Sequence, residues 1–166
     1  MQYPEIEKIF AQFEQLKILV VGDVMIDSYI WGSVDRISPE APVPIVRVKK
    51  KEIRLGGAAN VALNLQSLGA TPIMCTVTGD DMPAQQFQSL CENNHLSTEG
   101  VISSNERITT VKERIMSGSQ HIVRIDHEID HNLDNHSRKS LIAIFNKLIE
   151  KVDAVVFQDY DKKVKP

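Results

Sequence analysis

Two apolar patterns alternate along this chain. Continuous apolar runs of about four to eight residues predict strands that are buried on both faces, as in a parallel sheet. They occupy residues 17–24, 71–78, 101–104 and 153–158. Helical spacing of apolar residues occurs over residues 5–15, 82–94 and 135–151, and between Gly57 and Gly69. Because strands and helices alternate, we predict an α/β fold, doubly wound around a mostly parallel sheet, with the first helix packed beside the first strand.

The segment 28–51 interrupts this alternation. Its two strand-like stretches, 29–34 and 43–49, flank a proline-rich run. Because proline is excluded from central strands, we predict an edge or a protruding loop, forming a small β lid that covers a ligand or contacts a second subunit. The residues expected at such a lid or dimer contact are Tyr29, Trp31, Pro42 and Pro44. Packing of Trp31 within its own domain fits the sequence equally well.

A glycine-rich motif follows this segment. Gly56 and Gly57 precede the helical pattern that ends at Gly69. Glycines let a ligand approach the main chain closely, and the first turn of a helix presents unpaired N–H groups to that ligand. The side-chain amide of Asn60 both donates and accepts hydrogen bonds, which suits a sugar hydroxyl. The motif therefore predicts a polar-ligand site, while a helix that merely begins with glycines fits the same residues.

Two aspartates follow the first apolar run, which closes at Gly22. Open α/β sheets bind ligands beyond the carboxyl ends of their strands. Asp27 is therefore predicted to lie at the end of this strand and to accept hydrogen bonds from polyol hydroxyls. For Asp23 we favour the simpler interpretation that it caps a turn.

Cationic residues of the second half admit two interpretations. Two strands predicted over 109–116 and 121–126 form a hairpin. They carry Lys112, Arg114 and Arg124. These cations either place positive charge near a sugar phosphate or form ordinary ion pairs, such as Arg124 with Asp126. For each residue taken singly, we favour the ion pair.

Composition narrows the classes of function. The chain has 166 residues, 42% of them hydrophobic, which suits one globular domain. With a net charge of −3 and no apolar run of membrane-span length, neither nucleic acid nor a membrane is predicted as a partner. The N-terminus is not a secretory signal, and Cys75 and Cys91 read as buried thiols, so we predict a cytoplasmic protein. The four histidines between 121 and 136 fit no zinc spacing, so no metal site is predicted.

Two stretches carry a family resemblance. KILVVGDVMIDSYIWGSVDRISPEAPVPIVRV and RLGGAANVALNLQSLGA resemble the start of ribokinase-like (pfkB) sugar kinases, and RISPEAPVPIV is most similar to the heptose-7-phosphate kinases among them. The resemblance implies phosphoryl transfer from ATP, with Mg²⁺, to heptose 7-phosphate on the route to ADP-heptose and the lipopolysaccharide core. It also implies a homodimer formed through the lid. The substrate-binding residues that it implies are Asp27, Gly56, Gly57, Asn60 and Lys162.

The last residues resemble the family only in part. Asp159-Tyr160-Asp161-Lys162 is similar to the family's DYxKG, but Lys163 stands in place of the glycine. The family's GxGD-like motif, with its catalytic aspartate and anion hole, is not found after Asp159. The resemblance therefore implies that residues 1–166 are the N-terminal part of one kinase domain, with no catalytic residue and no activity alone. A non-catalytic sugar-phosphate-binding module and a lid-mediated dimerisation unit are the alternatives.

Overall fold

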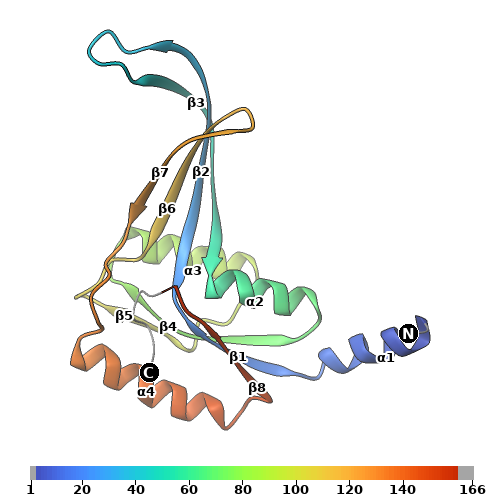
Figure 1. Cartoon of the computed structure of the whole chain (residues 1–166). Coiled ribbons are helices and arrows are strands. Elements are labelled where there is room, and N and C mark those ends of the chain that lie inside the picture. Colours follow the sequence, from blue (N-terminus) through green and yellow to red (C-terminus); the bar gives the residue numbers. More distant parts are fainter. Residues whose placement is uncertain (1–2, 161–166) are drawn as a thin grey trace.

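The body of the protein is built on a four-stranded parallel sheet, seen in a computed structural model that describes residues 3–160 (Figure 1). The strand order is β5-β4-β1-β8. The strands are β1 (Lys17–Gly22), β4 (Thr71–Gly79), β5 (Val101–Ser104) and β8 (Ala154–Gln158). Every residue of β1 except Lys17 is buried, as its continuous apolar run predicted. The parallel sheet of the predicted α/β fold is thus confirmed.

Helices cover both faces of this sheet. They are α2 (Ala58–Ser67), α3 (Met82–Asn93) and α4 (Asn135–Ile149). On one face, Ala62 of α2 and Phe87 of α3 belong to the same buried cluster as Val20. On the other face, Leu141 of α4 belongs to the same buried cluster as Leu19. Because adjacent residues of a strand point to opposite faces, two packed faces require the unbroken apolar run of β1.

Aspartates begin two of these helices. The Oδ1 atom of Asp81 accepts the N–H of Ala84 at 2.8 Å at the start of α3. At the start of α4, Oδ1 of Asp134 accepts the N–H groups of His136 and Ser137 at 2.8 and 2.9 Å. Hydrogen bonds, led by those from Ser137, lower the pKa of Asp134 to about 2. The stability that this charged cap contributes is therefore present above pH ~3.8 and is lost as the pH falls toward 2.

The first helix, α1 (Tyr3–Phe13), differs from its predicted placement. It extends away from the body instead of packing beside β1 (Figure 1). Ile6, Ile9 and Phe10 remain 37–48% exposed, so its apolar stripe lacks a partner face within residues 3–160. Amphipathic spacing predicts a helix, but it does not say which surface that helix covers. None of the described helices is both long and apolar enough to cross a membrane.

A second four-stranded sheet rises from the body, and we call it the lid (Figure 1). Its order is β3-β2-β6-β7. The strands are β2 (Val24–Ile37), β3 (Pro44–Gly57), β6 (Val111–Ser117) and β7 (Gln120–His127). β2 pairs antiparallel with β3 and parallel with β6, and β6 forms the predicted hairpin with β7. The sequence predicted β6 and β7 as strands without assigning them to the lid.

β3 is much longer than the predicted strand 43–49. It continues to Gly57, where it pairs with Val24 at the start of β2. Most of its side chains are at least partly exposed because the lid stands free of the body. Its sequence therefore mixes charged and apolar residues without the clean alternation of a half-buried strand. For this reason the pattern did not predict that the strand continues to Gly57.

The two cysteines are buried free thiols, as predicted. Burial raises the pKa of Cys75 to about 11 and, with a smaller effect of Glu92, that of Cys91 to about 12. Neither thiol is therefore a reactive thiolate near neutral pH.

Candidate functional site

The two sheets meet where β1 ends, and this junction forms the candidate site. β1 ends at Gly22, Asp23 follows, and β2 begins at Val24. β3 returns to the junction, where Gly57 pairs with Val24 and α2 begins at Ala58. The end of a body strand, the base of the lid and the N-terminus of a helix therefore lie together.

Both glycines of the motif are explained by close approaches at this junction. Gly57 has a φ of +59°, which L side chains rarely adopt, and an added Cβ would lie 2.2 Å from the carbonyl oxygen of Asp23. A Cβ on Gly56 would lie 2.6 Å from Oδ2 of Asp27. No side chain caps α2 at Gly57. The glycines thus let the main chain lie directly against both aspartates.

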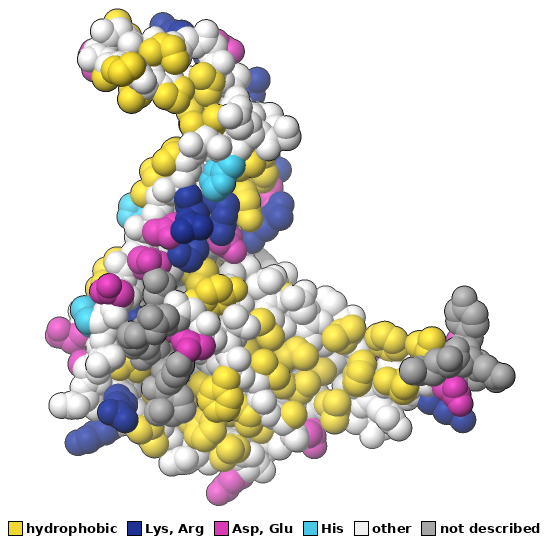
Figure 2. Space-filling view, viewed as in Figure 1, with side chains coloured by type: hydrophobic (Ala, Val, Ile, Leu, Met, Phe, Trp, Pro, Cys, Tyr) yellow, Lys and Arg dark blue, Asp and Glu magenta, His cyan; other side chains and the backbone are white. Residues whose placement is uncertain are grey.

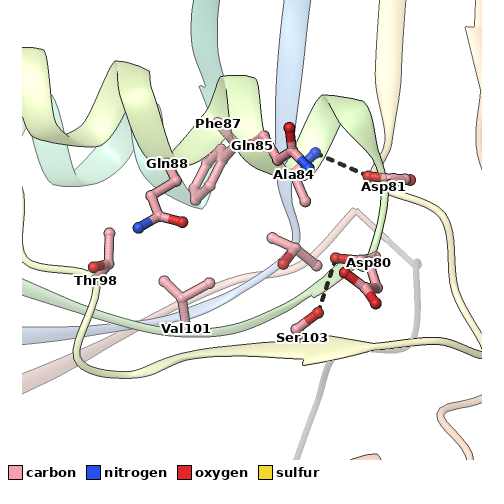
Figure 3. A pocket seen from close by; sticks show the side chains of 11 residues that line it. Asp80, Asp81, Ala84, Gln85, Phe87, Gln88, Thr98, Val101 and Ser103 are labelled. Atoms are coloured by element: carbon pink, nitrogen blue, oxygen red, sulfur yellow. Dashed lines mark hydrogen bonds between the residues drawn. The ribbon is translucent and has the colours of Figure 1, made fainter.

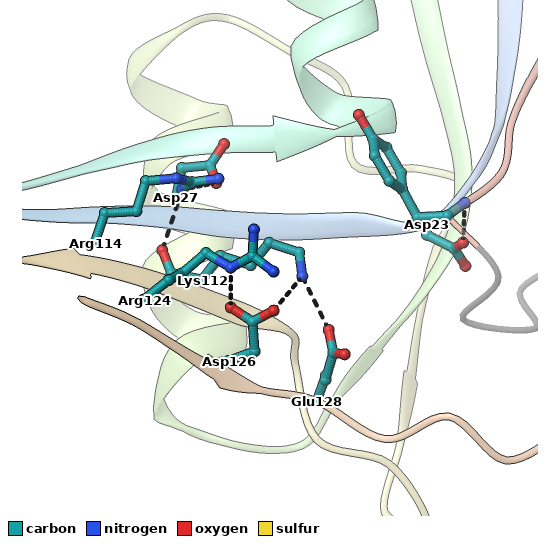
Figure 4. A network of polar contacts seen from close by, with 8 residues as sticks. Asp23, Asp27, Lys112, Arg114, Arg124, Asp126 and Glu128 are labelled. Carbon is teal, nitrogen blue, oxygen red and sulfur yellow. Dashed lines mark hydrogen bonds and ion pairs between the residues drawn. The ribbon is translucent and has the colours of Figure 1, made fainter. Parts of the chain in front are cut away.

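Asp27 lies within the lid, which corrects its predicted position at the end of the first strand. The chain breaks at Asp23 and starts a new strand, so Asp27 is the fourth residue of β2. Its Oδ2 atom lies against Gly56, within 2.6 Å of where an added Cβ would be. Its Oδ1 atom accepts a hydrogen bond from Nη1 of Arg114 on β6 at 2.5 Å (Figure 4). Burial tends to lower the pKa of Arg114, but the Asp27 carboxylate raises it overall.

Asn60 and Lys162 are the two remaining residues that were predicted to bind substrate. Asn60 lies exposed in the first turn of α2, two residues after the helix begins at Ala58. It is therefore on the element that starts at the junction. Lys162 lies outside the described residues.

The predicted lid residues lie along the hairpin of β2 and β3. Tyr29 and Trp31 stack with ring centroids 5.4 Å apart, and Nζ of Lys50 lies 5.3 Å from the centroid of the Trp31 ring. Trp31 thus has contacts within its own chain, and its place at a dimer contact stays a prediction. Pro42 and Pro44 are exposed at the outer end of the hairpin, where Pro44 begins β3.

Asp23 does more than the turn cap that we favoured. It is 2% exposed, and its Oδ2 atom accepts the N–H of Tyr160 at 2.7 Å. Its main chain accepts the N–H of Ala58 at 2.9 Å and donates to Gln158 at 3.1 Å. Burial lowers the pKa of Arg107, and the Asp23 carboxylate opposes that shift. Arg107 was not among the site residues predicted from the sequence. Asp23 therefore joins the ends of β1 and β8 to the start of α2.

The cations of β6 and β7 form a network beside Asp27 (Figure 4). Nζ of Lys112 contacts Asp126 at 2.9 Å and Glu128 at 3.1 Å, and Nε of Arg124 contacts Asp126 at 2.9 Å. Burial tends to lower the pKa of Lys112, but these two carboxylates raise it overall. The ion-pair interpretation is therefore confirmed for Lys112 and Arg124.

A polar cavity of about 410 Å³ lies between α3 and the neighbouring strands (Figure 3). Its lining includes Asp80, Asp81, Gln88, Thr98 and Ser103. Among the predicted substrate-binding residues that the structure describes, none lines it. The candidate site is therefore the junction of the two sheets and not this cavity.

Solved structures that resemble this fold include carbohydrate kinases. A carbohydrate kinase from Agrobacterium tumefaciens superposes with a TM-score of 0.60 at 18% identity, covering 86% of this chain and 45% of that one. A ribokinase from Cryptococcus neoformans var. grubii serotype A, solved in complex with ADP, gives a TM-score of 0.52 at 18% identity, covering 73% and 38%. At this identity the likeness establishes the fold alone.

Proteins with similar sequences identify the family to which this chain belongs. Residues 15–164 match the pfkB family of carbohydrate kinases, and the chain belongs to that family. The bifunctional protein HldE of Helicobacter pylori (strain HPAG1) is 46% identical over 148 residues, which cover 89% of this chain and 32% of HldE. HldE of Aliarcobacter butzleri (strain RM4018) is 45% identical over 147 residues, covering 89% and 31%. The chain thus spans about a third of the length of the curated relatives it matches.

Proposed function

We propose that this chain supplies the sugar-binding part of a kinase that transfers a phosphoryl group from ATP to heptose 7-phosphate. Family membership and the similarity to HldE support this assignment. In this proposal Asp27 accepts sugar hydroxyls, Gly56 and Gly57 bring the main chain close to the sugar, and Asn60 adds a side-chain amide. Lys162 is proposed to contact the substrate as well.

The observation that carries the proposal is the position of the Asp27 carboxylate. It lies directly against Gly56 at the base of the lid, only 22% exposed, with one oxygen bonded to Arg114. A carboxylate accepts several hydrogen bonds, so Asp27 can receive hydroxyl groups while it keeps this ion pair. Partial burial strengthens such bonds relative to those made in water.

The family and the ADP-bound ribokinase neighbour support ATP as the phosphoryl donor. Mg²⁺ is part of the proposal because ATP-dependent phosphoryl transfer uses it. Within residues 3–160, no group of three or more His, Cys, Asp or Glu side chains is arranged to hold a metal ion. We propose neither a metal ligand nor the catalytic base among these residues. These residues bind and orient the sugar in our proposal.

The test separates binding from turnover. We expect heptose 7-phosphate to bind the 166-residue chain in isothermal titration calorimetry, while coupled ADP-release assays detect no turnover above a no-protein control. A hybrid enzyme, in which residues 15–160 replace the matching part of Helicobacter pylori HldE, is expected to phosphorylate the sugar. Absence of binding by the chain, together with an inactive but folded hybrid, would refute the proposed function.

We further propose that the lid joins two copies of the chain. Ile37, Val43 and Val48 at its outer end are 52–59% exposed, and apolar side chains gather there in Figure 2. Exposed apolar patches of this kind favour protein contacts. We expect a dimer in sedimentation velocity at high micromolar concentration, and a monomer after the double change Ile37→Ser and Val43→Ser.

A control distinguishes the lid from another route of association. Phe157 is 59% exposed on β8, which is an edge strand and could pair with a second chain. Phe157→Ser should leave a lid-mediated dimer intact. A wild-type monomer, or a dimer that only the Phe157 change dissociates, would contradict the proposed lid contact.

We also infer a cytoplasmic location for the protein. Cys75 and Cys91 are both free and buried, which suits a reducing compartment. The inference rests on these thiols and on the bacterial relatives together.

A further inference from the structure

We propose that Arg54 and Arg114, arranged around the ring of Tyr29, bind the phosphate group of a sugar phosphate whose hydroxyls bind Asp27. This inference rests on the proposed function and assigns residues to the phosphate end of the substrate. The sequence had offered Arg114 near a sugar phosphate as one of two interpretations, with the ion pair favoured. Arg54, and the arrangement of the two arginines around Tyr29, come from the structure alone.

Strand register places these side chains on one face of the lid. Asp27 on β2 is paired with Arg54 on β3 and with Lys112 on β6, and Tyr29 is paired with Arg114. Paired residues of neighbouring strands point to the same face, and residues two apart on one strand do so as well. Asp27, Tyr29, Arg54 and Arg114 therefore share one face, directly above the glycine turn.

The guanidinium groups of both arginines lie beside the Tyr29 ring. The guanidinium carbon of Arg54 lies 5.2 Å from its centroid, and that of Arg114 lies 5.3 Å from it. Cation–π attraction favours the position of each guanidinium beside the ring. Two guanidiniums beside one ring present planar sets of donors, which suit a tetrahedral oxyanion better than two lysines would.

Each guanidinium retains hydrogen-bonding capacity for a ligand. Arg54 contacts Glu52 through Nε and Nη2, and Arg114 contacts Asp27 through Nη1. An arginine carries five N–H donors, so these described bonds leave further donors on both side chains. The Arg54 side chain is 58% exposed and that of Arg114 is 23% exposed, so a ligand on the lid face can reach them.

The neighbouring lysine is less suited to this role. Lys112 on β6 is 13% exposed and already contacts both Asp126 and Glu128. Lysine and arginine side chains gather with acidic ones on the lower part of the lid in Figure 2. The guanidinium groups that lie beside the Tyr29 ring are those of Arg54 and Arg114.

The test compares two forms of one sugar. Titration calorimetry on the 166-residue chain would measure heptose 7-phosphate and the unphosphorylated heptose, with wild type, Arg54→Gln and Arg114→Gln. Arg47→Gln is the matched control, because Arg47 lies farther out on β3 and pairs with Asp35 at 3.4 Å. Circular dichroism melting would verify that every variant is folded.

We expect Arg54→Gln to weaken binding of the phosphorylated sugar by roughly tenfold or more, as for the loss of a hydrogen bond to a charged group, and to leave the unphosphorylated sugar within about twofold. Arg114→Gln should also reduce the ratio of the affinity for the phosphorylated sugar to that for the unphosphorylated sugar. Arg47→Gln should leave both affinities unchanged. The wild-type preference should shrink as salt rises, because exposed charges are screened.

Other outcomes overturn the inference in distinguishable ways. If wild type binds both sugars equally, or if Arg54→Gln weakens both by the same factor, the phosphate does not bind these arginines, while the sugar site stands. If wild type binds neither sugar, this inference fails, and the proposed function fails with it only if the folded hybrid enzyme is also inactive.

Discussion

Replacing Asp27 with asparagine is expected to weaken sugar binding by roughly tenfold to a hundredfold, which corresponds to the loss of about 1.5–3 kcal/mol from a charge-assisted hydrogen bond. The carboxylate presents two acceptor oxygens, whereas the amide presents one acceptor and one donor. Asparagine also removes the charge that partners Arg114 at 2.5 Å. We therefore expect the affinity for the sugar to fall much more than the affinity for nucleotide in the hybrid enzyme.

The measurement pairs titration of the chain with the dependence of hybrid turnover on sugar concentration. Asp35→Asn is the matched control, since Asp35 also lies on β2 and also pairs with an arginine, Arg47, but farther out on the lid. We expect the control to bind sugar as wild type does. A lower melting temperature for Asp27→Asn, with unchanged sugar dependence, would show that the residue serves only to hold Arg114 and the lid.

Replacing Gly57 with alanine is expected to destabilise the fold by roughly 3 kcal/mol or more. Two penalties add at this position. The backbone has a φ of +59°, and the new Cβ would lie 2.2 Å from the carbonyl oxygen of Asp23. Backbone cannot rotate away as a side chain can, so the junction of β1, β3 and α2 must shift. Because this junction positions Asp27 and Asn60, we also expect sugar binding to be lost.

The chain contains a control that separates these two penalties. Gly118, in the turn between β6 and β7, has a nearly equal φ of +58°, but an added Cβ there would meet nothing within 4 Å. Gly118→Ala should therefore cost only the conformational part, about 1 kcal/mol. Urea unfolding of both variants gives the comparison. Equal losses of unfolding free energy would show that the contact between Gly57 and Asp23 relaxes freely and does not constrain the site.

Lid and body form one structural unit at the base of the lid. Asp23 links the ends of β1 and β8 to the start of α2, while the adjacent β2 carries Asp27. A ligand that contacts both Asp27 and the glycine turn would therefore contact both sheets. This coupling explains why we expect changes at Gly57 and at Asp27 to affect sugar binding although their effects on stability differ.

Local sequence patterns determined much of this protein. The apolar runs identified β1, β4 and β8 as strands, and the predicted burial on both faces holds for β1 and β4. It was wrong for β8, whose residues are all partly buried or exposed at the edge of the sheet. Helical spacing identified α2, α3 and α4, and the short turn between β6 and β7 identified their hairpin. The glycine motif and the closeness of Asp27 to it were also predictable, since both follow from elements that are short and sharply bounded.

Only the tertiary structure decided the surroundings of the candidate site. Asp27 and Arg114 are 87 residues apart, and Asp23 and Tyr160 are 137 apart, so no local spacing pairs them. The assignment of Asp27 to the lid depended on a break at Asp23, where β2 turns away from β1 into a second sheet. The position of α1 and the full length of β3 were likewise undetermined, because exposed elements are not constrained by a packing partner to show a clean pattern.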